Sequence, residues 1–450
     1  MSLFTPNMPQ DLQKIGIFGA GLSGCAAYHR AKNLGLFVVM SDDSPLDDQA
    51  IQDKGLDKTD LSAWQSWDMA GLDAVILSPG APHLHPAPHP IVTAAIDHNV
   101  PVISEVAFGL ATGNWGDMVV ITGTNGKSTT TALTAHILKQ AGKSVSVGGN
   151  LGTPLCALED QPDGITVLEL SSYQLETTPN LACAISALLN ITPDHLDRHG
   201  GIEGYQSAKR LSLSAVKTDG LALLGSGNQM MSEAIKWAEA NLDCAISVIS
   251  DEAVQTLKTK ITTACLAGDH NAENAAFAAA IANQFGVDQA SILTAINDFE
   301  GLPHRLQPVA NWHDVAFIND SKATNGDATA KALSAFDNII WLAGGRAKDD
   351  GLAACEGYFD RIKTAYFYGE CANAFSQEVG DKISNQCYGT LDDAFAAATS
   401  ALTGQEVVLL SPAAASFDQF PNFGSRGHHF ITLTNNFILS ASQKEVCHAR

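Results

Sequence analysis

The stretch VVITGTNGKSTTTALTAHIL, residues 119–138, decides how the centre of this chain folds. Its first residues are an apolar run typical of a buried strand, and its last residues are typical of a helix that Gly142 is placed to end. A phosphate-binding loop between such elements is usually spelled G-x-x-x-x-G-K-[ST]. In that spelling the first glycine would stand at Ile121, whereas here it is Gly123, so the turn is two residues shorter.

This short turn still carries the groups that bind phosphate. Its two glycines let the backbone turn tightly, so that amide hydrogens converge where the positive end of the following helix points. Lys127 can reach the β- and γ-phosphates of ATP, and the hydroxyl of Ser128 or Thr129 can ligate Mg²⁺. The residues expected to bind ATP here are Gly123, Thr124, Asn125, Gly126, Lys127, Ser128 and Thr129.

A second glycine loop, GAGLSG at residues 19–24, competes with the first as the nucleotide site. It spells G-x-G-x-x-G between an apolar run and a helical stretch, and Asp42 and Asp43 end the next apolar run. This pattern is typical of a dinucleotide site, with an acidic residue for a ribose hydroxyl. The same geometry holds the diphosphate of a UDP-sugar. A nicotinamide or flavin enzyme and an ATP-driven enzyme with a nucleotide-linked substrate therefore both stay open.

Composition narrows the class of protein. A chain of 450 residues is too long for one ordinary core, and two to four domains are expected. The net charge of -22 without a basic stripe argues against nucleic acid and anionic membranes as partners. The first residues lack the pattern of a signal peptide, no run of eighteen apolar residues occurs, and the 9 cysteines form no C-x-x-C pair. We expect a cytoplasmic monomer with reduced thiols.

Apolar runs alternate with helical stretches in three parts of the chain, which predicts an α/β fold with parallel sheets. We expect a Rossmann-like domain over 1–106, a central P-loop ATPase-like domain with a mostly parallel sheet over 107–301, and a Rossmann-like C-terminal domain over 302–450. Several apolar runs end in small or reactive polar residues. Since ligands bind at the carboxyl ends of parallel strands, we expect a composite site between domains.

Seven motifs in order resemble the Mur ligase and folylpolyglutamate synthetase superfamily, whose members form peptide-like bonds with ATP. They are GTNGKST at 123–129, ELSSYQLE at 169–176, NITPDHLDRH at 190–199, YQSAK at 205–209, GDHNAENAAFAAA at 268–280, GLPHR at 301–305 and NDSKATN at 319–325. A further stretch, LSPAAASFDQFPNFGSRGHHF at 410–430, is similar to the branch that adds D-glutamate to UDP-N-acetylmuramoyl-L-alanine.

The resemblance implies a reaction and its participants. ATP would phosphorylate the carboxylate of UDP-N-acetylmuramoyl-L-alanine to an acyl phosphate, which the amine of D-glutamate attacks, in cytoplasmic peptidoglycan precursor synthesis. One or two Mg²⁺ ions are implied, for which Mn²⁺ can substitute. The implied catalytic residues are Lys127, Glu169, His195 and Lys209, and the implied metal-site residues are Ser128, Glu169, His195 and Lys209, the last as a carbamate.

The resemblance also assigns ligands to the three domains. ATP would be clamped between the second and third by Asn274, Arg305 and Asp320. The residues implied for D-glutamate are Lys322, Thr324, Lys348, Ser416 and Phe423. Arg346 is an alternative to Lys348, because GGRAKDD departs from the G-K-S spelling of that loop. The residues implied for the UDP-substrate are Leu22, Ser23, Asp42, Asp43, Ser78, Gly80 and Asn150, although the Asp-Thr-Arg-like trio of some members is missing.

Three alternatives remain beside the D-glutamate ligase. An oxidoreductase using GAGLSG would leave GTNGKST and NDSKATN without a role. A non-catalytic ATP-binding regulator is disfavoured by the intact Lys127, Glu169, His195 and Lys209. A sister ligase that adds another amino acid is disfavoured only by the stretch at 410–430.

Overall fold

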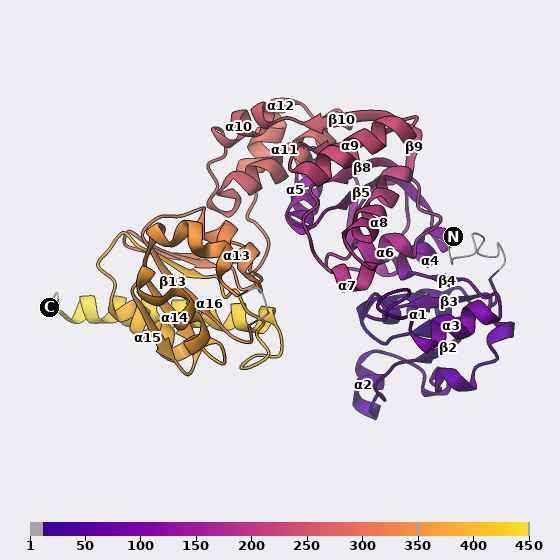
Figure 1. The fold of residues 1–450 in the computed structure, drawn as a ribbon, viewed down its shortest axis with the longest axis horizontal. Coiled ribbons are helices and arrows are strands. Elements are labelled where there is room, and N and C mark those ends of the chain that lie inside the picture. Colours follow the sequence, from indigo (N-terminus) through magenta and orange to yellow (C-terminus); the bar gives the residue numbers. More distant parts are fainter. Residues whose placement is uncertain (1–11, 348–350, 449–450) are drawn as a thin grey trace. The chain divides into compact units, whose positions relative to one another are not determined.

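The computed structural model describes residues 12–347 and 351–448. The chain divides into two compact units, Met1–Val254 with Ala276–Ile292, and Gln255–Ala275 with Leu293–Arg450. The helices α10 (Asp251–Lys258), α11 (Asp269–Gln284) and α12 (Gln289–Asn297) each contain a point where the chain passes from one unit to the other. Figure 1 labels these three helices and strands of all three sheets. The domain boundaries expected from the sequence stay a prediction.

The first sheet, in the first unit, is parallel and has the strand order β2-β1-β3-β4 over the described residues. Its strands are β1 (Lys14–Phe18), β2 (Phe37–Ser41), β3 (Ala74–Leu77) and β4 (Val102–Ile103). Its helices are α1 (Leu22–Asn33), α2 (Asp48–Asp53), α3 (Pro90–Asp97) and α4 (Glu105–Thr112), with short 3₁₀ turns η1 (Lys58–Asp60), η2 (Trp64–Ser66) and η3 (Met69–Gly71). Because β1 lies between β2 and β3, the strand order reverses there and leaves a crevice at their carboxyl ends.

Helices cover both faces of this sheet. Along β3, Ala74 and Ile76 pack into one buried cluster with Ala27 of α1, while Val75 and Leu77 pack into another with Ile91 of α3. Side chains of a strand alternate between the two faces, so a sheet buried on both sides needs a continuous apolar run. The sequences of β1 and β3 have that run, which is why they form inner strands.

The central sheet, also in the first unit, has the order β10-β9-β8-β5-β7-β6, and each described pair is parallel. Its strands are β5 (Trp115–Thr122), β6 (Val145–Gly149), β7 (Gln161–Glu169), β8 (Cys183–Leu188), β9 (Val216–Gly225) and β10 (Ala245–Ile249). Its helices are α5 (Lys127–Gln140), α6 (Ser172–Glu176), α7 (Leu196–His199), α8 (Ile202–Ser214) and α9 (Gln229–Asn241), with η4 (Leu155–Ala157). The ends of β5, β7 and β8 lie side by side, so their following loops can share one site.

The third sheet, in the second unit, has the order β11-β12-β16-β13-β14-β15 in the described part of the chain. Its strands are β11 (Gln307–Trp312), β12 (Val315–Asn319), β13 (Ile339–Gly344), β14 (Ile362–Tyr368), β15 (Asn385–Tyr388) and β16 (Val407–Leu410). The helical elements of this part of the chain are α13 (Gly326–Leu333), α14 (Ala372–Val379), α15 (Leu391–Ser400), α16 (Phe423–His448), η5 (Ala264–Leu266), η6 (Ala353–Arg361) and η7 (Gly380–Lys382). The edge strand β11 pairs antiparallel with β12, whereas the other described pairs are parallel.

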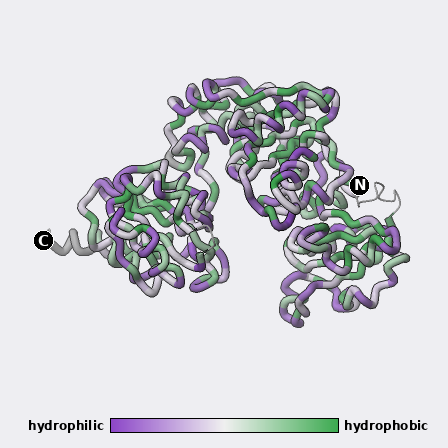
Figure 2. Tube along the Cα trace, in the orientation of Figure 1, coloured by the Kyte–Doolittle hydropathy of each residue, from purple (hydrophilic) through white to green (hydrophobic). Residues whose placement is uncertain are grey.

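The α/β class with parallel sheets that the sequence predicted is confirmed. Hydrophobic residues follow the inner strands, and hydrophilic residues follow the loops and outer helices (Figure 2). Val119, Val120 and Ile121 of β5 are fully buried, and each such side chain stabilises the fold by about 1.5–3 kcal/mol. Among the helices of the described residues, none has the length and apolar character that crossing a membrane requires.

Candidate active site

The phosphate loop joins β5 to α5, and its two glycines adopt conformations that other residues rarely reach. Their φ angles are +157° at Gly123 and +85° at Gly126. The segment after β8 holds the loop in place, because the amides of Thr124 and Asn125 donate to the backbone and side-chain oxygens of Asn190 over 3.0 and 2.9 Å. The helix α5 begins directly after Gly126. The turn therefore has the backbone of an anion site at a helix N-terminus.

Two lysines meet at this loop. The Nζ atoms of Lys127 and Lys209 both donate to the carbonyl oxygen of Gly123 over 2.8 Å, and Lys127 also donates to the carbonyl of Thr124 over 2.8 Å. Lys209 is only 1% exposed. Burial, and then the charge of Lys127, lower the pKa of Lys209 well below its ordinary value. Lys209 is thus a buried amine that favours the neutral form.

Tyr205 connects Lys209 to the phosphate loop. Tyr205 and Lys209 lie one turn apart on α8, and the Nζ of Lys209 lies 4.6 Å from the centroid of the Tyr205 ring. The Tyr205 hydroxyl lies 3.0 Å from Oγ1 of Thr124. Burial raises the pKa of Tyr205, and the bond to Thr124 offsets this only in part, so the phenol stays protonated and can donate. The aromatic face and the loop together fix where the amine points.

Glu169 at the end of β7 has one oxygen engaged and one without a partner. Its Oε1 accepts from Nδ2 of Asn150 over 2.7 Å, while its buried Oε2 has no hydrogen-bond partner. Glycine is required beside it, because φ is +90° at Gly149 and a Cβ there would lie 2.3 Å from the Glu169 carbonyl oxygen. A buried carboxylate oxygen without a donor is costly unless a cation or proton meets it. Glu169 therefore fits a metal ligand.

His195 begins the short helix α7 in a left-handed conformation, with φ of +52°. Its Nε2 lies 3.5 Å from Oδ2 of Asp194, and its ring centroid lies 5.3 Å from that of Tyr173. Burial lowers the pKa of His195, Asp194 opposes this, and the nearby Lys127 adds to it. A neutral imidazole of this kind can accept a proton or ligate a metal ion.

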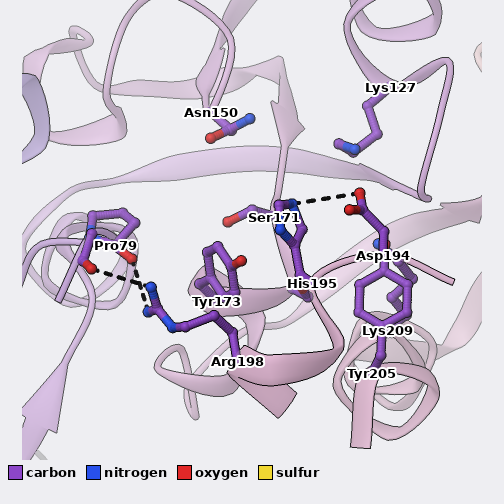
Figure 3. A pocket seen from close by; sticks show the side chains of 12 residues that line it. Pro79, Lys127, Asn150, Ser171, Tyr173, Asp194, His195, Arg198, Tyr205 and Lys209 are labelled. Atoms are coloured by element: carbon purple, nitrogen blue, oxygen red, sulfur yellow. Dashed lines mark hydrogen bonds and ion pairs between the residues drawn. The ribbon is translucent and has the colours of Figure 1, made fainter. Parts of the chain in front are cut away.

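These residues surround one cavity of about 330 Å³. Figure 3 shows Lys127, Asn150, His195 and Arg198 reaching it from different segments of the chain. The residues that line it are Pro79, Gly80, Lys127, Asn150, Ser171, Ser172, Tyr173, Asp194, His195, Arg198, Tyr205 and Lys209. We call it the reaction cavity. Three of the four predicted catalytic residues thus line one cavity, and the fourth, Glu169, is bonded to its wall through Asn150.

The residues predicted for the metal site do not by themselves form a complete set of metal ligands. In the part of the chain that the structure describes, no three histidine, cysteine, aspartate or glutamate side chains are grouped to hold a metal ion. Glu169 and His195 need further oxygen ligands, which a hydroxyl of Ser128 and a carbamate on Lys209 would supply. The orphaned oxygen of Glu169 and the buried amine of Lys209 fit this assignment, which stays a prediction.

A second cavity of about 400 Å³ lies in the crevice after β1 and β3. We call it the glycine-loop cavity. It is lined by Phe18, Gly19, Gly21, Leu22, Ser23, Asp42, Asp43, Ser78, Pro79, Gly80 and Ala81. Every residue predicted for the UDP-substrate lines this cavity except Asn150, which lines the reaction cavity. Pro79 and Gly80 line both cavities.

The two aspartates of the glycine-loop cavity differ in their partners. The carboxylate of Asp42 accepts from the amides of Ala20 and Ser44 over 2.6 and 3.0 Å, so it holds the glycine loop against the end of β2. Asp43 is exposed and lies 3.2 Å from Nε2 of His89. Of the two, Asp43 has the freer carboxylate for a ligand, whereas Asp42 orders the loop.

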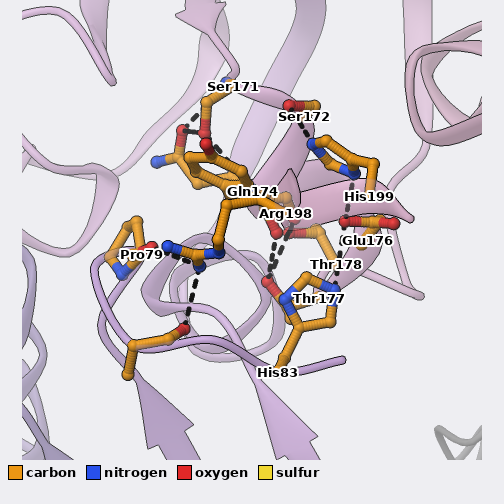
Figure 4. Close-up of polar contacts among 12 residues, drawn as sticks. Pro79, His83, Ser171, Ser172, Gln174, Glu176, Thr177, Thr178, Arg198 and His199 are labelled. Atoms are coloured by element: carbon orange, nitrogen blue, oxygen red, sulfur yellow. Dashed lines mark hydrogen bonds and ion pairs between the residues drawn. The ribbon is translucent and has the colours of Figure 1, made fainter. Parts of the chain in front are cut away.

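Polar side chains connect the wall of the reaction cavity to the segment after β3 (Figure 4). Oε2 of Glu176 lies 3.0 Å from Nε2 of His83 and 3.1 Å from Nδ1 of His199, and Nε2 of His199 lies 2.9 Å from Oγ of Ser172. Burial would raise the pKa of Glu176, but the bonds to His199 and His83 outweigh it and lower that pKa. The carboxylate is therefore held ionised between two imidazoles.

The residues predicted for adenosine and D-glutamate lie in the second unit. Asp320 is buried, accepts from Leu306 N and Ser411 Oγ over 3.1 and 2.9 Å, and has its pKa raised by burial to about 7. Asn274 is also buried and donates to Oδ1 of Asn271 over 3.2 Å. Arg305 is the third residue of this set. A site that combines them with Lys127 of the first unit remains a proposal.

Part of the predicted D-glutamate set is brought together. Nζ of Lys322 lies 5.1 Å from the centroid of the Phe423 ring, and the neighbouring Ser321 donates to the Phe423 carbonyl over 2.8 Å. Ser416 is buried and Thr324 is half-buried, whereas Lys348 lies outside the described residues. Arg346, the alternative to Lys348, is paired with Glu370 over 3.0 Å through two nitrogens. Its charge is therefore already matched.

The reaction cavity is also lined by residues that the sequence did not predict for the site. Ser171, Tyr173 and Arg198 all line it. They stand in the motifs ELSSYQLE and NITPDHLDRH, within which only acidic and histidine residues were predicted for the site. The signal that could have found Arg198 is an arginine three residues after His195, on the short helix that His195 caps.

Comparisons with known proteins agree with this geometry. Residues 121–282 match the Mur ligase middle domain, and residues 304–414 match the Mur ligase glutamate ligase domain. The UDP-N-acetylmuramoylalanine–D-glutamate ligase of Rhodospirillum rubrum is 40% identical, over 94% of this chain and 94% of that protein. The ligase of the same name from Nitrobacter winogradskyi is 39% identical, over 93% and 95%.

Solved structures support the fold. The UDP-N-acetylmuramate-alanine ligase MurC of Thermotoga maritima aligns with a TM-score of 0.59 at 17% identity, covering 94% of this chain and 99% of that one. MurF of Acinetobacter baumannii aligns with a TM-score of 0.54 at 19% identity, covering 74% and 79%. At these identities the likeness concerns the architecture alone.

Proposed function

The chain belongs to the Mur ligase family, and from that premise we propose that it joins D-glutamate to UDP-N-acetylmuramoyl-L-alanine with ATP, in peptidoglycan precursor synthesis. The observation that carries this proposal is the match along nearly the whole chain to ligases of that name. The reaction cavity supports it, because Lys127, His195 and Lys209 meet there beside a phosphate loop. A cytoplasmic location and a monomeric state remain predictions from the sequence.

The chemistry requires two anions to meet. The γ-phosphoryl group of ATP passes to a carboxylate oxygen of the acceptor, and ADP leaves. The amine of D-glutamate then attacks the carbonyl carbon of the acyl phosphate, the C–O bond to phosphate breaks, and the amine loses a proton. Lys127 and the amides of the turn lower the cost of charge on the transferring group. Since Lys127 now donates to two backbone carbonyls of the turn, a triphosphate has to replace those bonds.

Divalent metal would bind at Glu169, His195, Ser128 and a carbamate on Lys209. Bound Mg²⁺ supplies positive charge to phosphate oxygens and thereby eases the approach of the acceptor carboxylate. The neutral amine of Lys209 is the form that adds to the carbon of CO₂ and releases one proton, and burial favours that form. His195, with its lowered pKa, is also placed to accept a proton in the cavity.

The acceptor would occupy both cavities of the first unit. Its uridine diphosphate would lie in the glycine-loop cavity, with Leu22, Ser23, Asp43, Ser78 and Gly80 around it, and Asp42 holding the loop. Its alanyl carboxylate would lie in the reaction cavity beside Asn150. The glycine loop thereby binds a diphosphate without nicotinamide.

The second unit would supply the remaining contacts to ATP and the contacts to D-glutamate. Asn274, Arg305 and Asp320 would contact ATP, and Lys322, Thr324, Ser416 and Phe423, with Lys348, would hold D-glutamate. A composite site of this kind needs the two units to close on the ligands and exclude water from the acyl phosphate. Small-angle scattering should therefore show compaction when ATP and acceptor are added, and an unchanged profile would contradict closure.

Phosphate release tests the proposal directly. Release should require the muramoyl-alanine acceptor and D-glutamate together, and a panel of amino acids in the same assay should show D-glutamate as the preferred substrate. Preference for another amino acid would identify a sister ligase. Release that needs neither substrate, or binding of NADH in place of ADP, would contradict the ligase.

A further inference from the structure

Residues 79–81 form a turn between the two cavities of the first unit. Pro79 and Gly80 line both cavities. On one side, the turn is fixed to the glycine loop, because Oγ of Ser78 donates to the carbonyl of Gly19 over 3.2 Å. A Cβ at Gly19 would lie 2.3 Å from that Oγ, so the approach of the two segments allows only glycine there. A ligand that fills both cavities has to run along this turn.

Arg198 holds the other side of the turn. Its Nη1 donates to the carbonyl of Gly80 over 3.2 Å, and its Nη2 donates to the carbonyls of Pro79 and Ala81 over 3.3 and 3.2 Å. Its guanidinium carbon lies 4.5 Å from the centroid of the Tyr173 ring (Figures 3 and 4). A planar guanidinium can serve three carbonyls and an aromatic face at once, whereas an ammonium cannot match that arrangement.

The helix that carries Arg198 directly follows a predicted catalytic residue, His195. α7 begins directly after His195, and its last residue, His199, is linked through Glu176 to His83 of the segment that follows the turn. One end of this short helix therefore borders the reaction cavity, while its side chains hold the 79–83 segment. The spacing between the glycine loop and His195 depends on these bonds.

We propose that Arg198 is a positioning residue that fixes the spacing between the diphosphate loop and the reaction cavity. It thereby selects an acceptor whose reacting carboxylate lies at the far end of a nucleotide-linked sugar. This inference rests on the proposed function and deepens it, because it names one side chain that makes the site select acceptors of the right length. Arg198 acts through the turn, so its loss affects a ligand that spans both cavities and spares a ligand confined to the first.

The test compares a spanning ligand with a short one. In the full chain, Arg198→Met removes all three bonds, and Arg198→Lys keeps the charge. Arg361→Lys is the matched control, since Arg361 also donates to two backbone carbonyls, those of Ser334 and Phe336, but lies in the second unit. Calorimetry gives the Kd of UDP alone and of the complete UDP-linked acceptor, and steady-state assays give KM for the acceptor, ATP and D-glutamate.

For Arg198→Met we expect the Kd and KM of the complete acceptor to rise at least tenfold. The Kd of UDP and the KM values of ATP and D-glutamate should stay within twofold, and Arg361→Lys should match the wild type throughout. A loss of UDP affinity in the same proportion, or an acceptor Kd within twofold of wild type, would overturn the positioning role.

Two further arms keep the test decisive. If Arg198→Met fails to fold, Arg198→Lys is the test variant. We then expect the Kd of the acceptor to rise at least threefold and the Kd of UDP to stay unchanged. Equal changes in the two Kd values would overturn the inference. If the wild type binds the acceptor but releases no phosphate with D-glutamate, the proposed function fails. The ratio of acceptor to UDP affinity in the variants still tests Arg198 in that case.

Discussion

Lys127 and Lys209 donate to one and the same backbone oxygen, the carbonyl of Gly123, each over 2.8 Å. They lie on different helices, α5 and α8, and one of them is almost fully buried. A second ammonium group at this acceptor would be repelled by the first, and burial removes the water that would screen the two charges, so Lys209 favours its neutral form. The arrangement is suited to a state in which anions arrive, either phosphate oxygens at Lys127 or a carbamate at Lys209.

Replacing Lys127 should abolish turnover. Lys127→Ala removes the principal side-chain cation near the transferring phosphoryl group, and we expect kcat to fall by about a thousandfold or more. Phosphate release measures the loss. Lys139→Ala, an exposed lysine in the last turn of the same helix, serves as the control and should behave as wild type. Activity of Lys127→Ala within about tenfold of wild type would contradict the assigned role.

Replacing Lys209 by an apolar residue should raise the stability of the fold and remove the activity. The pKa of Lys209 is lowered in the fold, chiefly by burial, so the folded state binds its proton more weakly than the unfolded state does. The free energy of unfolding therefore carries a cost at neutral pH that disappears only as the pH rises toward the unfolded pKa of about 10.4. We expect Lys209→Met to raise the thermal midpoint at pH 7 by a few degrees and to lose activity.

The exposed Lys217→Met is the control for that change, and its thermal midpoint should stay at the wild-type value. A lower midpoint for Lys209→Met would mean that the amine stabilises the fold. Chemical rescue tests the carbamate separately. Short-chain carboxylates should restore part of the activity of Lys209→Ala, because they supply the missing oxygens, and a lack of rescue would count against the carbamate while leaving the fold unaffected.

Glu169→Gln should impair metal binding without disturbing the loop. The amide oxygen of glutamine can still accept from Nδ2 of Asn150, but the charge at the unpartnered Oε2 position is lost. We expect kcat to fall by about a hundredfold or more and the Mg²⁺ concentration for half-maximal activity to rise. Titrations with Mg²⁺ measure both. The exposed Glu159→Gln should leave the curve unchanged, and an unchanged curve for Glu169→Gln would remove it from the metal site.

The buried carboxyl of Asp320 should make the second unit less stable at high pH. Burial raises the pKa of Asp320 to about 7, whereas the unfolded chain has the ordinary value of about 3.9. Between these values the folded state binds more protons, so the free energy of unfolding falls as the pH rises. Asp320→Asn removes this effect, so its stability relative to wild type should be greater at pH 8 than at pH 5.

Denaturant unfolding at the two pH values measures this difference. Asp381→Asn, at an exposed position of the same unit, should show the same offset from wild type at both. If Asp320→Asn also shows equal offsets, the carboxyl has an ordinary pKa in the folded chain. The cost of burying its charge would then be offset by neighbouring groups and not by protonation.

The sequence by itself determined the elements whose causes are local. The glycines at 123 and 126 and those at 19 and 21 predicted two binding turns, because a tight turn beside a phosphate needs residues without a Cβ. Apolar runs alternating with helical stretches predicted an α/β fold with parallel sheets. The edge strand β11 was not predicted, since QPVANW lacks both a continuous apolar run and regular alternation. Its strand conformation depends on its pairing with β12.

Only the tertiary structure decided which of these side chains meet. Lys209 lies 86 positions from Gly123, and Arg198 lies 118 positions from Gly80. Such contacts depend on the order of strands and on the burial of each helix, which residue spacing does not encode. The same reason explains why Asp42, a predicted ligand contact, turned out to hold its own loop, and why Arg198, overlooked in a recognised motif, bridges the two cavities. Local geometry follows from residue type, whereas electrostatic environment follows from the fold.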